Sequence, residues 1–443
     1  MRLRLLRRLS SALCLLSSVA AVAAAEPRWW KGNLHTHSLW SDGDDYPEMI
    51  ADWYKTRGYH FLGLSDHNRL QSGPRWIELK QPVSIAGQVQ LGGSNTVLAR
   101  YVARFGADWV ERRTENGVTQ VRLKPLEEYR ALLEEPGRFL MIPSLEISQG
   151  RVRQPDGTFR GAAVHMNVTN VREHIPNQKG DDALTIMQAT VDAVLEQRKR
   201  TGTPMFPHLN HPNFQLGVTP EEFMQVRGEQ FFEVYNGHSG VNNEGDATHN
   251  SMDRLWDLVN ARRLTELNLP ILFGIGVDDS HHYHAFEFGR QNPGRGWVMV
   301  RARHLTPESI VAAMEAGDFY ASTGVTLTDV RREGTTLSLA IAAEPGVTYT
   351  TRFIGTRRGY DSASEVMPNP EDAARGSKPH RRYSAEIGKV FATVEGATAS
   401  YTLQPDDLYV RAKIVSSKPK ANGSAREEFE TAWTQPVVNE RKD

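Results

Sequence analysis

The chain has 443 residues, of which 39% are hydrophobic and 24% are charged. This composition is that of a globular protein with room for one large domain and a smaller one. The formal net charge of −1 excludes a general electrostatic attraction to nucleic acid or to an anionic membrane. A phosphate-bearing ligand would therefore have to be held by local cations, and metal ions can supply them.

The first 25 residues have the pattern of a cleaved export signal. Four arginines within the first ten residues precede an apolar run over residues 12–24, and small residues follow at Ala23, Ala24 and Ala25. A positive start, an apolar stretch and an A-x-A site are typical of secretory signal peptides, and the run is short for a membrane span. We therefore expect a mature protein that begins near Glu26, has no membrane span and is periplasmic or secreted.

Cys14 is the only cysteine, and it lies inside this signal. The mature protein would have no disulfide within the chain and no thiolate that acts as a nucleophile or metal ligand. Any metal site must then use His, Asp and Glu side chains. This set of ligands suits Zn, Mn or Fe in a hydrolytic role.

Short apolar strands alternate with amphipathic helices from Trp29 to about Val325. We expect strands at Gly32–His37, His60–Asp66, Phe139–Ile147, Ala162–Thr169, Pro204–Asn210, Phe231–Asn236 and Ile271–Asp278. We expect helices at Pro47–Arg57, Ala183–Arg200, Met252–Arg262 and Pro307–Ala316. The alternation favours the α/β class, with a parallel sheet or a βα barrel.

Two segments depart from this alternation. Residues 70–138 are long, polar and interrupted by Gly92 and Gly93, so we expect an insertion with helical segments that lies over the mouth of the barrel. After residue 325, β-rich stretches at Thr335–Ile341, Thr348–Ile354 and Tyr409–Val415 are separated by turn-forming residues. They predict a small antiparallel β domain over residues 326–443, and residues 26–325 then form the domain that carries the chemistry.

Ligand-type or polar side chains occur at the same end of the seven predicted strands. His35 and His37 are two residues apart on one strand, so both imidazoles point to the same side and can bind one metal ion. Similar residues at the other strands are Asp66, His67, Glu146, His165, His208, His211, Glu233, Asp278, Asp279 and His281. Each alone has an ordinary structural explanation, such as a helix cap or a hydrogen-bonded core histidine. Together they predict a metal site at the carboxyl ends of barrel strands, because grouped buried carboxylates need cations.

These residues also form motifs that resemble those of the polymerase and histidinol phosphatase (PHP) family. The motifs are His35-Thr36-His37-Ser38 with Ser41-Asp42-Gly43, then Ser65-Asp66-His67-Asn68, Glu146, His211-Pro212 and Asp279-x-His281. The resemblance covers roughly residues 31–325 without the segment 70–138. It implies a distorted seven-stranded (β/α) barrel that binds two or three divalent metal ions.

The resemblance further implies nine metal ligands. One ion would be held by His35, His37, Glu146 and Asp279, a second by Glu146, His165 and His211, and a third by Asp42, His67 and His281. His208 competes with His211 for its ligand position, and Pro212 after His211 fits the family better.

The expected activity is hydrolysis of a small-molecule phosphate mono- or diester by a hydroxide that bridges two metal ions. Asp66, His208 or His282 could protonate the leaving group. Two alternatives stay open. The same site could hydrolyse a carboxylic ester, a carbamate or an amide, or the chain could be a non-enzymatic barrel that binds a metal or another ligand. No association with nucleic acid is expected, because the chain has no basic stripe.

Overall fold

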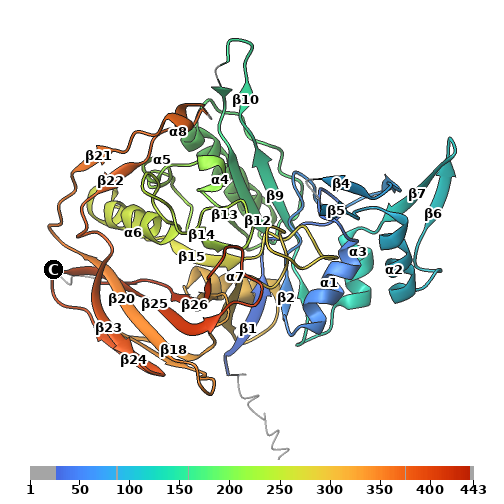
Figure 1. Ribbon diagram of the computed structural model, residues 1–443. Helices are drawn as coiled ribbons and strands as arrows, with labels where there is room; N and C mark the ends of the chain where they lie inside the picture. Colours follow the sequence, from blue (N-terminus) through green and yellow to red (C-terminus); the bar gives the residue numbers. More distant parts are fainter. Residues whose placement is uncertain (1–25, 86–87, 158, 375, 440–443) are drawn as a thin grey trace, which may run out of the picture.

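The structure is a computed structural model, and it describes residues 26–85, 88–157, 159–374 and 376–439. The expected export signal, residues 1–25, lies outside the described residues. Helices and strands are mixed along the described chain (Figure 1). Among the described helices, none combines the length and the apolar character that a membrane span requires.

A five-stranded sheet carries many of the expected ligands. Its order is β15-β14-β13-β12-β9, with β9 at Ser144–Gln149, β12 at Val164–Thr169, β13 at Phe206–Leu209, β14 at Phe231–Asn236 and β15 at Phe273–Val277. Strands β13, β14 and β15 are parallel, whereas β12 is antiparallel to both β9 and β13. Parallel pairing is therefore a wrong prediction for β12. The reason is its connection to β9, which is a hairpin of the short strands β10 (Val152–Arg153) and β11 (Phe159–Arg160) and contains no crossover helix.

A second sheet has ten strands and runs through both halves of the chain. Its path is β23-β20-β25-β26-β17-β16-β1-β2-β8, and β27 pairs with β25. The bounds are β1 Arg28–Asn33, β2 Phe61–Leu62, β8 Leu140–Met141, β16 Trp297–Ala302, β17 Phe319–Ser322, β20 Tyr349–Arg357, β23 Lys389–Glu395, β25 Asp407–Pro419, β26 Phe429–Thr434 and β27 Val437–Val438. Because β26 pairs with β17, hydrogen bonding continues across residue 325. The predicted domain boundary there stays a prediction.

Single β-bridges join the two sheets at the end where the expected ligands lie. Thr36 pairs with Ser280, and His67 pairs with Glu146. The described strands do not form one closed, hydrogen-bonded barrel, since β2 and β8 have two residues each, too few to pair continuously around a ring. The α/β class is confirmed, whereas a seven-stranded barrel is not.

The predicted helices are present and cover the sheets. They are α1 Pro47–Thr56, α4 Ala183–Thr201, α6 Met252–Arg262 and α7 Pro307–Glu315. The Thr306 side chain caps α7 by accepting from the backbone N–H of Ser309. Helix α4 packs on β12 and β13, α6 on β14 and α7 on β16. Their apolar faces bury core residues such as Trp256 and Met187, which are fully inaccessible to solvent.

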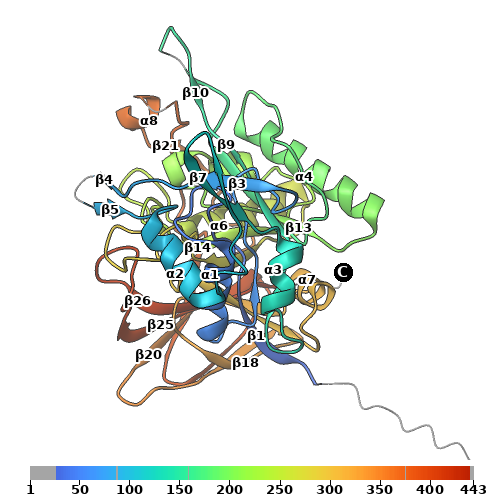
Figure 2. The ribbon, with the colours of Figure 1, turned by 90° about the vertical axis from the view of Figure 1, so that its right-hand side faces the viewer.

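The segment 70–138 contains strands as well as the expected helices. Its elements are β3 Arg75–Glu78, β4 Val83–Ile85, β5 Gln88–Gln90, α2 Asn95–Phe105, β6 Arg112–Glu115, β7 Val118–Leu123 and α3 Leu126–Leu133. Figure 2 views the molecule from the side on which α2 and α3 lie. The segment contacts loops next to the expected ligands, because Gln71 donates to Asp66 (2.6 Å) and Arg100 contacts His284 (2.7 Å).

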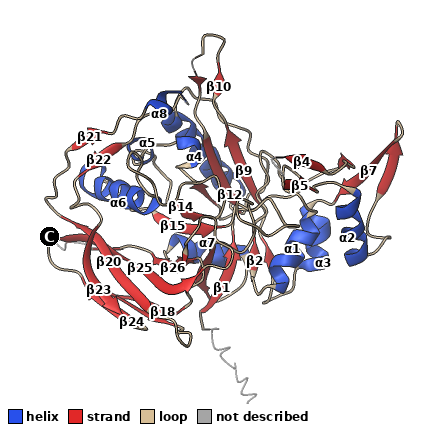
Figure 3. Cartoon of the chain, viewed as in Figure 1, coloured by secondary structure: helices blue, strands red, loops and turns tan. Residues whose placement is uncertain are grey.

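Beyond residue 325, the described chain is mainly antiparallel β structure, as predicted (Figure 3). The strands β18 Leu327–Glu333, β19 Thr336–Ile341 and β24 Thr398–Thr402 form a second layer, and β21 Ser364–Val366, helix α8 Pro370–Ala374 and β22 Arg381–Tyr383 form an excursion. The excursion contacts the loops that follow β13 and β14, for example through His249 and Asp372 (3.0 Å). The remaining short elements are η1 Phe214–Leu216, α5 Pro220–Phe223 and η2 Arg263–Leu267.

Candidate metal centre

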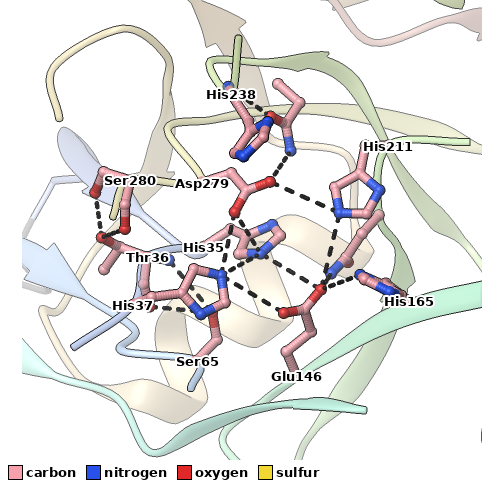
Figure 4. Close-up of polar contacts among 12 residues, drawn as sticks. His35, Thr36, His37, Ser65, Glu146, His165, His211, His238, Asp279 and Ser280 are labelled. Carbon is pink, nitrogen blue, oxygen red and sulfur yellow. Dashed lines mark hydrogen bonds and ion pairs between the residues drawn. The ribbon is translucent and has the colours of Figure 1, made fainter. Parts of the chain in front are cut away.

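Side chains from both sheets meet at the end where the β-bridges lie (Figure 4). All nine residues that the family resemblance assigns as ligands occur in overlapping groups, within each of which the potential ligand atoms lie within 4.8 Å of one another. The groups are His37-Asp42-His67-His281, His35-His211-Asp279, His35-His37-Glu146 and His67-Glu146-His165, and a fifth group joins His35 to His208 and Glu233. Strands far apart in the sequence thus bring the nine side chains together. Which ion each of them binds stays a prediction.

Glu146 lies at the centre of the cluster and is fully buried. Its Oε1 is 3.1 Å from His165 Nδ1 and 3.6 Å from His35 Nε2. Its Oε2 is 2.5 Å from His67 Nδ1 and 3.5 Å from His37 Nε2. Each carboxylate oxygen therefore faces a different pair of imidazoles, which is the arrangement that a bridging carboxylate needs.

Asp279 lies on the other side of the two N-terminal histidines. Its Oδ1 is 3.2 Å from His35 Nε2 and 3.1 Å from His37 Nε2, and these two nitrogens are 3.1 Å apart. Asp279 adopts a left-handed backbone conformation with φ of 49°, which is unusual for a residue other than glycine and is common at functional sites. Its backbone N–H donates to the carbonyl of His35, so the strained turn is tied directly to β1.

Asp42 forms the solvent-facing side of the cluster. Its Oδ1 is 3.4 Å from His281 Nε2 and 3.7 Å from His67 Nε2, and its side chain is 59% exposed. The rings of His67 and His281 both stack against the imidazole ring of His37, with centroid distances of 4.3 and 4.1 Å. This is the part of the centre that a ligand from solvent meets first.

The electrostatics of the cluster favour the protonation states that metal binding requires at some of the expected ligands and oppose them at others. Against the effect of burial, nearby carboxylates raise the pKa of His35, of His67 (to about 9) and of His281, so metal binding there has to displace a proton. His37, His211 and Glu146 behave differently. Burial lowers the pKa of His37 to about 3 and that of His211 to about 4, so both imidazoles are neutral. Burial works against ionisation of Glu146, but the surrounding histidines His67, His35 and His165 hold its pKa well below the ordinary value. Metal ligands must be neutral imidazoles and ionised carboxylates, and these groups meet that condition.

Two buried polar atoms at the centre, Glu146 Oε2 and His165 Nδ1, have no well-formed hydrogen bond to a described residue, although they lie 2.5 Å from His67 Nδ1 and 3.1 Å from Glu146 Oε1, respectively. Buried polar groups nearly always have a hydrogen-bond partner. A polar atom that is buried without one raises the free energy of the folded state. The donor set is imidazole nitrogen and carboxylate oxygen, which suits Zn, Mn or Fe. The residues present therefore fit divalent metal ions.

Glu233 takes part in the site although it was not among the expected ligands. Its Oε1 contacts His35 Nδ1 at 2.6 Å, and its Oε2 accepts from the backbone N–H of His211 (2.8 Å) and from Asn236 (2.7 Å). Glu233 thereby holds His35 with Nε2 directed at Glu146 and Asp279, which is how a carboxylate orients a metal-binding histidine. Its pKa is about 2 because, against the effect of burial, His35 and His208 favour the ionised form. The sequence signal for this role is a carboxylate inside an otherwise apolar strand.

The structure separates His208 from His211. His211 Nε2 is 3.8 Å from Glu146 Oε1 and 3.7 Å from Asp279 Oδ2. His208 lies beside Glu233 instead, with Nε2 3.5 Å from its Oε1, and the side chain has no solvent exposure. His211 therefore faces the cluster, whereas His208 lies behind His35.

Replacing His211 with alanine should lower the metal content of the purified protein, whereas replacing His208 with alanine should leave metal bound and reduce turnover. The reason is that His211 reaches Glu146 and Asp279, whereas His208 acts on the centre only through Glu233 and His35. Elemental analysis and rate measurements on the same samples test this. Loss of metal in the His208 variant alone would reassign the ligand role to His208.

The three proton donors expected from the sequence, Asp66, His208 and His282, differ in burial and in hydrogen bonding. Asp66 has no solvent exposure, and it accepts hydrogen bonds from Ser38, Ser41 and Gln71, so it holds the loop after β1. His208 is equally buried. Neither side chain is accessible to solvent, and the acid role of these residues stays a prediction. His282 is partly exposed, but its ring nitrogens contact Gln291 and Gln90 at 3.3 Å.

His238 is a second residue that sequence reasoning missed. It follows β14 directly, is partly exposed, and its ring lies 5.5 Å from that of His281. Burial lowers its pKa to about 4, which makes the ring neutral at neutral pH. A single histidine after the strand carries no motif, so only the fold places it beside the cluster.

No family model matches the sequence, and no curated protein matches it either. One similar solved structure is a two-domain protein from Bacteroides vulgatus containing a predicted PHP-like metal-dependent phosphoesterase. It is 13% identical in sequence and has a TM-score of 0.39, and the match covers 92% of this chain and 95% of that chain. Another is a metal-dependent phosphoesterase of unproven activity from Bifidobacterium adolescentis; it is 13% identical, the match covers 58% of this chain and 89% of that chain, and the TM-score is 0.27. The first description names the family that the motifs resemble. Similarity at these TM-scores carries no conclusion about the activity of this chain.

Proposed function

We propose that this chain is a metal-dependent hydrolase of the PHP type, and that it hydrolyses a small-molecule phosphate mono- or diester. The observation that carries the proposal is the convergence of nine ligand-type side chains around the buried Glu146. The bridges Thr36–Ser280 and His67–Glu146, which join the two sheets at this end, support a distorted barrel.

The expected ligands would be distributed among the metal ions as the family resemblance implies. His35, His37, Glu146 and Asp279 would hold one ion, Glu146, His165 and His211 a second, and Asp42, His67 and His281 a third. Divalent ions such as Zn, Mn or Fe would lower the pKa of a water molecule and neutralise charge on phosphate oxygens. Glu233 would keep the His35 ring in its binding orientation.

The charge of the centre favours an anionic substrate. Asp42, Glu146, Glu233 and Asp279 supply four negative charges. Two divalent ions would balance them (4 − 4 = 0), and three would leave a local charge of +2 (6 − 4). A phosphate ester gains electrostatic attraction at such a centre, whereas a neutral carboxylic ester gains less.

Solvent access decides which side chains a substrate meets. The side-chain exposures are 59% for Asp42, 25% for His67, 16% for His165 and 13% for His281. His35, His37 and Glu146 have none. A phosphate group would therefore approach from the side of Asp42 and His67, while the inner ligands stay shielded from bulk water.

The proposal also includes export. It rests on residues 1–25 alone, which predict a mature chain from Glu26 in the periplasm or outside the cell. The partner would be a small molecule, since neither charge nor motif indicates nucleic acid.

Turnover of p-nitrophenyl phosphate or bis-p-nitrophenyl phosphate should depend on added metal and should exceed turnover of p-nitrophenyl acetate. The test removes metal with a chelator, reloads separate samples with Zn, Mn and Fe, and measures all three substrates on each sample. Chelation should lower phosphoester turnover by roughly a hundredfold or more, because water activation and charge neutralisation are both lost. Metal-dependent turnover of the acetate alone would replace the phosphoesterase by a carboxylic ester hydrolase. A protein that binds metal but hydrolyses none of the three would favour a binding barrel.

A further inference from the structure

His238 is positioned at the edge of the metal centre but belongs to none of the groups of expected ligands. Figure 4 shows it beside Asp279, on the side away from Glu146. Its ring is 5.5 Å from that of His281 and 5.6 Å from that of Phe214. Unlike His208, it is partly exposed to solvent, so a molecule bound at the centre can reach it.

One hydrogen bond determines which ring nitrogen of His238 carries the proton. The backbone N–H of Gly240 donates to Nδ1 at 2.9 Å. A nitrogen that accepts a hydrogen bond has no proton, so the neutral ring is protonated at Nε2. No described residue forms a hydrogen bond with Nε2. The side chain therefore presents a free N–H donor at the edge of the centre.

The position of this donor is fixed relative to the expected ligands. The backbone N–H of His238 donates to Asn236 Oδ1 at 2.8 Å, and Asn236 Nδ2 donates to Glu233 (2.7 Å) and Asp279 (3.1 Å). Ser239 also donates to the carbonyl of Gly289 (3.0 Å), in the loop that follows the ligand His281. A donor held in this way costs little reorganisation when it binds a developing or permanent negative charge.

We propose that His238 forms a hydrogen-bonding subsite, in which Nε2–H donates to a phosphoryl oxygen of the substrate at the metal centre. The inference rests on the proposed function and adds a substrate contact to it. It also supplies a donor where Asp66 and His208 are inaccessible to solvent. The alternative is a purely structural role, in which His238 only closes the turn to Gly240.

Two substitutions separate these roles. His238→Asn keeps an acceptor close to the position of Nδ1, so it can still close the turn to Gly240, but its amide is too short to replace Nε2. His238→Gln places an amide N–H close to the position of Nε2. His304→Asn is the matched control, because His304 is exposed and lies outside the cluster.

The experiment measures metal content, the affinity of the metal-loaded proteins for inorganic phosphate by calorimetry, and kcat and KM for p-nitrophenyl phosphate. Metal content should be the same in all four proteins. Phosphate affinity should fall by about tenfold or more in His238→Asn, the size expected for one hydrogen bond to a charged group. It should stay close to that of the wild type in His238→Gln and His304→Asn.

Phosphate affinity within about twofold of the wild type in His238→Asn would overturn the subsite, as would loss of metal in that variant. The same titrations are repeated with acetate. If the wild type binds acetate but not phosphate, the phosphoester proposal fails. The subsite is then supported when His238→Asn alone loses acetate affinity, and overturned when it does not.

Discussion

Replacing Glu146 with glutamine should lower the hydrolysis rate by roughly a hundredfold or more while the fold stays intact. Both carboxylate oxygens of Glu146 face imidazole nitrogens, at 3.1 Å for His165 and 2.5 Å for His67. Glutamine has the same shape but no charge, and its NH₂ group cannot serve as a ligand. The variant would therefore lose the group that links two ion positions, and its metal content should fall with its rate.

Glu48→Gln is the matched control for this prediction. Glu48 is also fully buried, but it lies outside the cluster and accepts hydrogen bonds from Tyr101 and Trp109. Burial raises its pKa to about 7, so a neutral side chain is tolerated there. Metal content, turnover and thermal unfolding should be measured on the same preparations. Turnover at the wild-type rate in Glu146→Gln would refute the proposed role of Glu146 in metal binding and turnover.

Local structure was largely predictable because its signals are local. Strand β14 (Phe231–Asn236) and helix α6 (Met252–Arg262) begin and end at the predicted residues. Helix α6 has Ser251 as its N-cap, and the strand is a continuous run of buried residues. Most of the expected ligands could be placed for the same reason, since they follow or end a readable strand, whereas His165 lies near the start of β12, which is antiparallel to its neighbours.

Strand pairing was less predictable because it depends on distant parts of the chain. Strand β17 pairs with β26, so that Tyr320 lies opposite Thr434. Nothing in either segment indicates the other, and the sheet that results joins two regions that differ in composition. The direction of β12 was missed although the loop of the hairpin β10–β11 contains Pro155-Asp156-Gly157, a strong turn signal.

The residues that surround the expected ligands were even harder to predict from the sequence, because their contacts depend on the fold. Glu233 contacts His35, which is 198 positions away in the chain. The sequence shows only a carboxylate in an apolar strand, which predicts a partner but does not identify it. His238 depends on a loop conformation, because the contact with Gly240 decides its tautomer. Motifs therefore predicted the candidate ligands, whereas the residues proposed to orient them or to contact substrate required the structure.

A buried ionic contact links the expected catalytic region to the C-terminal β structure. Arg411 on β25 donates through Nε and Nη2 to Asp257 on α6, at 2.9 and 2.6 Å, and its side chain is 1% exposed. Its Nη1 is 2.9 Å from Asp253. Against the effect of burial, Lys413 and Arg411 hold the pKa of Asp253 below its ordinary value. A carboxylate of this kind stabilises the fold above its unfolded pKa of about 4, and the stabilisation is lost as the pH falls.

Arg411→Met should lower the free energy of unfolding by about 3–5 kcal/mol at pH 7, because it leaves the Asp257 carboxylate buried without its cation. The loss should shrink as the pH falls below the ordinary carboxylate pKa of about 4, because carboxylates that have lost their cation become protonated there, whereas Asp253 of the wild type stays ionised to lower pH. Urea titrations at several pH values measure both effects.

The control Arg331→Met removes an ion pair whose arginine is 63% exposed and should cost less than about 1 kcal/mol. In the double variant Arg411→Met/Asp257→Leu, much of the lost stability should return, since no unpaired charge remains at that position. Equal losses in Arg411→Met and Arg331→Met would show that the buried pair does not join α6 to β25 energetically.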